Sequence, residues 1–217
     1  MKKLLLTLGL VCAFTCNLAQ AASISVKGQE LNYKMPEGYC AFNPQTEKES
    51  SYIQFFDKAL GRSVDLKALV APCEEISKAR AGKYEGLSNF ILIGLVGVDG
   101  HFMKFRLGNK AYMGFAKLLK PQDIERTVKR ANERLKPFNA KVQSLMISDP
   151  YIENNQVNFE GNINLGYKDI SAGFDFRLAS ALADDWPIAV GLLYRNDRDA
   201  KKPLLAYLNI MHDLKNN

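Results

Sequence analysis

The sequence predicts an α+β domain with a mainly antiparallel sheet and helices packed against it. Two patterns predict this class: helical apolar spacing occurs in pairs of segments, whereas strands with alternating polarity follow one another in runs. The 217 residues are 47% hydrophobic and 24% charged, which is enough apolar material for a buried core. No repeat, low-complexity stretch or linker divides the chain. We therefore expect one domain over residues 22–217, preceded by a leader over residues 1–21.

The first residues have the three parts of a cleaved secretory signal. Lys2 and Lys3 precede an apolar run over residues 4–16, and the small residues Ala19 and Ala21 predict cleavage after Ala21. The run is shorter than the roughly 20 residues that span a bilayer. Cleavage removes two lysines and lowers the formal charge from +6 to +4. We expect a bacterial protein that is periplasmic or secreted, with no transmembrane segment in the mature chain.

Two cysteines remain after cleavage, Cys40 and Cys73. A pair of cysteines in an oxidising compartment predicts a disulfide bond. The alternative is a catalytic thiol, which needs a histidine or a cationic neighbour to lower its pKa. Neither histidine is close to a cysteine in sequence, although folding could bring one near.

The first elements follow from short-range patterns. Alternating apolar residues over 24–34 predict a strand or hairpin, and residues 35–39 predict a turn. Apolar residues at helical spacing predict a helix over 51–60 that stops at Gly61.

A second helix begins at either Asp65 or Pro72. We favour Pro72 as its first residue, because Glu74 and Glu75 would then lie in the first turn. Lys78 and Arg80 would lie near the end of the helix, and Gly82 would follow it. One apolar face would consist of Leu66, Leu69, Val70, Cys73 and Ile76. Residues 90–98 predict a buried strand, with 101–107 as its hairpin partner.

The second half contains helices, then strands, then one closing helix. Residues 111–138 are helical with a break at Pro121, and an apolar seam is expected at Ile124, Val128, Ala131 and Leu135. Strands are expected over 143–148, 157–165, 174–178 and 188–194, with a hairpin turn at Asn154-Asn155. Pro203 opens the closing helix. Its expected apolar side consists of Leu204, Leu205, Leu208, Met211 and His212.

The helix after Pro121 also has a basic side. At 100° per residue, one side opposite the apolar seam carries Arg126, Lys129, Arg130 and Arg134. Such a ridge predicts binding of an anionic partner, such as a lipid headgroup, a polysaccharide or an acidic protein. The alternative is an ordinary solvated helix face. Nucleic acid is disfavoured by export and by the lack of interleaved aromatic residues.

Common catalytic signatures are absent from the sequence. It contains no Gly-x-Ser-x-Gly, no phosphate-binding loop ending in Lys-Ser/Thr, no His-Glu-x-x-His and no Cys-x-x-Cys. The glycines of residues 94–100 lack dinucleotide-loop spacing. The acidic loops at 184–186 and 196–199 could bind calcium, but they lack EF-hand spacing. We therefore assign no catalytic residue, cofactor or metal.

The element order, with the segments Tyr33-Lys34-Met35-Pro36-Glu37-Gly38-Tyr39 and Trp186-Pro187-Ile188, resembles the PsbP-like α/β/α sandwich. This resemblance covers most of the mature chain but no functional motif. It implies a non-catalytic accessory or binding role, because most PsbP-like proteins have one. We expect an exported, soluble, non-catalytic binding or accessory protein of the bacterial envelope, or a factor secreted toward a host. The alternative is a secreted hydrolase whose site combines scattered residues.

Overall fold

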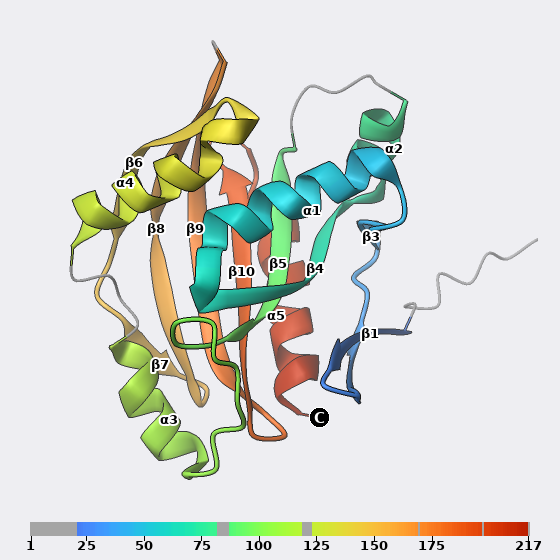
Figure 1. Cartoon of the computed structure of the whole chain (residues 1–217). Coiled ribbons are helices and arrows are strands. Elements are labelled where there is room, and N and C mark those ends of the chain that lie inside the picture. The colour runs from blue at the N-terminus through green and yellow to red at the C-terminus, as the bar shows by residue number, and fades with distance from the viewer. Residues whose placement is uncertain (1–20, 82–86, 119–122, 169, 197, 217) are drawn as a thin grey trace, which may run out of the picture.

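The structure is a computed structural model that describes residues 21–81, 87–118, 123–168, 170–196 and 198–216. An eight-stranded antiparallel sheet forms its centre, with the order β3-β4-β5-β10-β9-β8-β6 and with β7 paired to β8 (Figure 1). A separate hairpin contains β1 and β2. Helices and this sheet form one α+β domain, which confirms the predicted fold class. The expected leader lies outside the described residues, apart from Ala21.

The strands are β1 (Ala21–Val26), β2 (Gln29–Lys34), β3 (Tyr39–Ala41), β4 (Val64–Pro72), β5 (Asn89–Val96), β6 (Ala140–Ile147), β7 (Tyr151–Glu153), β8 (Gln156–Tyr167), β9 (Ile170–Ala183) and β10 (Trp186–Arg195). The helices are α1 (Glu47–Leu60), α2 (Cys73–Arg80), α3 (Gly108–Lys117), α4 (Ile124–Leu135) and α5 (Lys201–Lys215). Single 3-10 turns follow α1 and α4, η1 (Gly61–Ser63) and η2 (Lys136–Phe138). Asn154 and Asn155 both have positive φ, as the two-residue turn between β7 and β8 requires.

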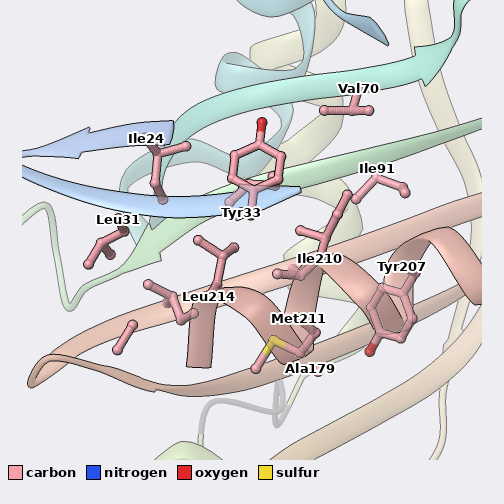
Figure 2. Close-up of a cluster of buried hydrophobic side chains, with 14 of the residues drawn as sticks. Ile24, Leu31, Tyr33, Val70, Ile91, Ala179, Tyr207, Ile210, Met211 and Leu214 are labelled. Carbon is pink, nitrogen blue, oxygen red and sulfur yellow. The ribbon is translucent and has the colours of Figure 1, made fainter. Parts of the chain in front are cut away.

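Helices cover both faces of the sheet, and strand β9 shows how the faces divide. Phe174 packs under α1, and Leu178 packs under α3. The odd-numbered residues of this strand face the opposite side, where Ala179 and Ala181 leave room for α5. The hairpin β1–β2 closes this second side: Leu31 and Tyr33 belong to the same core as α5 and the central strands (Figure 2).

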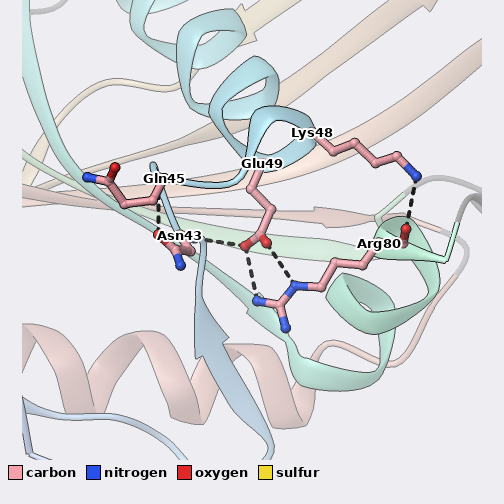
Figure 3. Close-up of polar contacts among 5 residues, drawn as sticks. All are labelled: Asn43, Gln45, Lys48, Glu49 and Arg80. Carbon is pink, nitrogen blue, oxygen red and sulfur yellow. Dashed lines mark hydrogen bonds and ion pairs between the residues drawn. The ribbon is translucent and has the colours of Figure 1, made fainter.

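A buried carboxylate joins α1 to the end of α2 (Figure 3). Glu49 is 1% exposed. Its carboxylate accepts hydrogen bonds from Arg80 Nε at 2.8 Å and Nη2 at 3.2 Å, and from the backbone N–H of Asn43 at 2.7 Å. These bonds hold the pKa of Glu49 below its ordinary value, with the Arg80 hydrogen bond as the largest cause. The disulfide between Cys40 and Cys73 ties the other end of α2 to β3, as predicted.

Several predicted elements are confirmed with shifted bounds. The hairpin over 24–34, the turn at 35–39 and the helix ending at Gly61 are present, although α1 begins at Glu47. The strand over 90–98 is β5, and 188–194 lies in β10 at the centre of the sheet. The two predicted helices within 111–138 are α3 and α4, while Pro121 lies outside the described residues.

The favoured start of the second helix at Pro72 is confirmed to within one residue, since α2 begins at Cys73 with Pro72 as its N-cap, while Gly82 lies outside the described residues. Three predictions about local structure are wrong. The first is the helix face that included Leu66, Leu69 and Val70, because these residues belong to strand β4, which also excludes the alternative start at Asp65. The segment 101–107 makes only a bridge from His101 to Val98, because β4 and β10 occupy both sides of β5.

The third correction concerns the phase of α5. Leu205, Leu208 and His212 are exposed. The helix buries a different set of side chains: Pro203, Ala206, Tyr207, Ile210, Met211 and Leu214. Ala206 and Tyr207 pack in the core with the central strands, and the spacing of the leucines in this helix does not predict that. Among the described residues, no helix is long and apolar enough to cross a membrane.

Candidate anion-binding site

Helix α4 positions the basic ridge that the sequence predicts. The carboxylate of Asp123 accepts the Arg126 backbone N–H at 2.8 Å and so caps the first turn. On the inner side, Ala131 and Leu135 are buried against β6, together with the half-buried Val128. Three of the four predicted seam residues thus pack in one cluster, while Ile124, in the first turn, is half-buried outside it. This burial determines which side of α4 faces water.

Three of the four predicted ridge residues lie together on that outer side. Arg126, Lys129 and Arg130 are all exposed. One helical turn separates Arg126 from both others, which places the three cations side by side. Their clustering forms a positively charged surface, as the spacing predicts.

Arg134 has a different role in the structure. Its Nε donates to the carbonyl of Lys58 at 2.8 Å, and its Nη2 donates to that of Ala59 at 2.9 Å. These carbonyls belong to the last turn of α1, where a cation is favourable. The guanidinium also lies over Gly61, where an added Cβ would be 2.9 Å from Arg134 Cζ. Arg134 therefore joins α4 to α1 and stands apart from the other three ridge residues.

A groove of about 920 Å³ runs beside the ridge, between α4 and the edge of the sheet. Its lining residues are Glu125, Val128, Lys129, Asn132, Glu133, Lys136, Asn139, Ala140, Lys141, Gly166 and Lys168. Four lysines and two glutamates give this lining a positive balance. Lys129 contributes to both the ridge and the groove.

The side chain of Asn132 fixes the helix against strand β6. Its Nδ2 donates to the carbonyl of Val142 at 3.0 Å, and its Oδ1 accepts the Val142 N–H at 2.6 Å. Val142 lies on the edge strand β6, and α4 thus provides hydrogen-bond partners for both its backbone N–H and its carbonyl. These bonds hold α4 against β6 at the wall of the groove.

Sequence reasoning did not assign Lys136, Lys141 or Lys168 to the site. Lys136 and Lys141 add to the positive charge around α4, which is a sequence signal. Lys168 follows β8 and reaches the site because its backbone N–H donates to Asn139 O at 3.2 Å. No local pattern predicts that contact.

The structure gives little support to a catalytic thiol or to a site built around either histidine. Cys40 and Cys73 are bonded to each other, so neither is a free thiol nucleophile. The ring of His212 contacts the amide of Asn216 at 3.2 Å, and His101 lies in the bridge to Val98. Within the described ranges, no group of three or more histidine, cysteine or acidic side chains could hold a metal.

The two acidic loops have other contacts. The Asp184 carboxylate accepts hydrogen bonds from Gln29 and from Lys104, and these bonds lower the pKa of Asp184, with that of Gln29 as the larger cause. Asp199 accepts the backbone N–H of Lys201 at 3.0 Å. Asp197 lies outside the described residues. The carboxylates of Asp184 and Asp199 thus have protein partners.

No family model matches this chain, and no curated protein matches it. Among solved structures, it is similar to cyanobacterial PsbP (CyanoP) from Synechocystis sp. PCC 6803. The identity is 12%, the TM-score is 0.42, and the match covers 92% of this chain and 94% of that one. The Ran-binding protein Mog1p of Saccharomyces cerevisiae is 8% identical, with a TM-score of 0.34 and coverage of 90% and 93%. The PsbP-like resemblance seen in the sequence therefore recurs in the structure, at the level of the fold alone.

Proposed function

We propose that this protein is an exported, non-catalytic binding protein that holds an anionic ligand on α4 and in the adjacent groove. The observation that carries this proposal is the meeting of two basic features. The exposed ridge of Arg126, Lys129 and Arg130 borders a groove to which other parts of the chain add further lysines. Cations gathered from separate segments concentrate positive potential where a ligand can lie.

Export is supported by the leader pattern and by the disulfide, since such bonds persist in oxidising compartments. The periplasm and the exterior of the cell both fit this chemistry. A non-catalytic role is supported by the bonded cysteines and by the contacts of His212 with an amide rather than a carboxylate.

Binding of dextran sulfate, measured by isothermal titration calorimetry, tests the proposal. We expect affinity to fall steeply between low and physiological salt, because contacts between fixed charges are screened. The double variant Arg126→Glu/Arg130→Glu should weaken binding by at least about tenfold, with little change in melting temperature, since exposed charges contribute little to stability.

The matched control is Lys201→Glu/Lys202→Glu on α5, where both lysines are exposed and the net charge changes by the same amount. It should change affinity by less than about threefold, since α5 packs on the opposite face of the sheet from α4. If both variants lose the same affinity for dextran sulfate, binding depends only on the net charge of the protein, which would contradict a site on α4.

A further inference from the structure

Helix α3 presents large apolar side chains to solvent. Leu107, just before the helix, is 79% exposed, and Leu118, just after it, is 72% exposed. At 100° per residue Leu118 lies on the same side as the exposed Ala111, whereas Leu107, at the N-cap, is separated from the helix by the left-handed backbone of Gly108. The opposite side of the helix is the packed one: Tyr112 and Ala116 are fully buried against β8 and β9. The exposed apolar residues Leu107, Ala111 and Leu118, here called the apolar stripe, are therefore not part of the core.

The same segment is strongly cationic. Residues 100–118 contain four lysines and arginines and no aspartate or glutamate. Lys104 is paired with Asp184 of the β9–β10 turn at 3.1 Å, and its ammonium lies 5.8 Å from the Trp186 ring. Arg106, Lys110 and Lys117 are exposed. Lys110 and Lys117 lie next to the apolar stripe on the outer side of the helix.

We propose that α3 docks this protein on the surface of an anionic lipid bilayer. Leucines flanked by cations on the outward side of a helix are the pattern of an interfacial helix, which inserts its apolar side chains at the headgroup boundary. The cations would face the negative charge of the lipids. The stripe has few residues, so the contact would be shallow and reversible.

The charge of the segment favours this occupant over a second copy of the chain. A symmetric contact through α3 would bring the cations Arg106, Lys110 and Lys117 of one copy close to the same set of cations on the other, which is repulsive. An anionic bilayer offers negative charge to the cations and an apolar boundary to the exposed leucines. Met103, 65% exposed in the loop that leads to α3, adds a further apolar side chain to this end of the molecule. This docking surface does not depend on the groove beside α4.

Cosedimentation with phosphatidylcholine vesicles, with and without phosphatidylglycerol, tests the proposal. The protein is expressed from the full chain in an exporting bacterial host and purified after export. We expect binding to the phosphatidylglycerol vesicles and at least tenfold weaker binding to pure phosphatidylcholine. Leu107→Gln/Leu118→Gln and Lys110→Glu/Lys117→Glu should each weaken binding to the anionic vesicles by at least about tenfold.

Lys201→Glu/Lys202→Glu on α5 is the matched control, because both lysines are exposed on a helix that belongs to neither proposed surface, and it should lower vesicle binding by less than about threefold. The α4 variant Arg126→Glu/Arg130→Glu is measured beside it. Equal vesicle binding by the leucine variant and the parent would overturn the proposal. So would a larger loss in the α4 variant than in the α3 variants, which would assign lipid binding to the ridge. Dextran sulfate binding by the leucine variant reports the α4 site separately, so failure of one proposal is distinguishable from failure of the other. Melting temperatures close to that of the parent show that each variant is folded.

Discussion

Replacing Glu49 with glutamine should destabilise the fold by about 2–3 kcal/mol at neutral pH. The carboxylate is buried and accepts two hydrogen bonds from Arg80 and one from the backbone N–H of Asn43. A glutamine side chain has one acceptor oxygen and one NH₂ group, so at least one N–H donor would face another donor. Breaking a buried ion pair costs roughly 3–5 kcal/mol. We expect less here because the Arg80 side chain is 50% exposed and water can solvate it.

The destabilisation should depend on pH. Because the pKa of Glu49 is lowered in the folded protein, its charge contributes stability above the ordinary glutamate pKa of about 4.3. That contribution is lost as the pH falls through the lowered folded value. The difference in unfolding free energy between parent and variant should therefore be largest near pH 7 and shrink in acid.

Urea unfolding followed by circular dichroism at pH 7 and near pH 3 measures both effects. Glu47→Gln is the matched control, because Glu47 is an exposed carboxylate in the same first turn of α1. It should change stability by no more than about 0.5 kcal/mol. The reasoning is refuted if Glu49→Gln is as mild as this control at pH 7, or if its cost is equally large at both pH values.

Three further changes test other contacts by the same unfolding measurement. Cys40→Ala/Cys73→Ala opens a loop with a sequence separation of 33 and should cost roughly 3–4 kcal/mol; unchanged stability would argue against the bond. Gly61→Ala should cost at least about 1 kcal/mol, because the position has φ +69° and the new Cβ would crowd Arg134; a stabilised variant would contradict this contact. Tyr112→Phe removes a buried hydroxyl bonded to a serine of β9, so we expect a loss of about 1 kcal/mol, and a loss below about 0.3 kcal/mol would mean that the bond is dispensable.

The sequence correctly predicted those elements in which buried apolar residues recur at one regular spacing. Helix α4 is an example, because its apolar seam recurs every three or four residues and one capping aspartate precedes it. Part of strand β4 was predicted as a helix face, since the spacing of Leu66, Leu69 and Val70 fits a helix as well as a buried strand. The strand has apolar neighbours on both sides in the sheet, which a local pattern does not reveal.

The candidate site divides in the same way. Arg126, Lys129 and Arg130 follow from helix geometry alone and lie where the spacing predicts. The contact of Arg134 with the end of α1 joins residues about 75 positions apart, and the approach of Lys168 depends on the pairing of β8 with β6. Such contacts follow from the order of strands in the sheet, which no short segment encodes.

The two hydrogen bonds between Asn132 and Val142 also bear on how copies of this chain behave together. Strand β6 is at the edge of the sheet, and an edge offers unpaired peptide groups to any extended strand that approaches. The amide of Asn132 presents a donor and an acceptor to Val142 much as a neighbouring peptide would. At this position the edge is already filled from within the same molecule. The helix that carries the proposed anion site thus also protects one edge of the sheet against strand addition and aggregation.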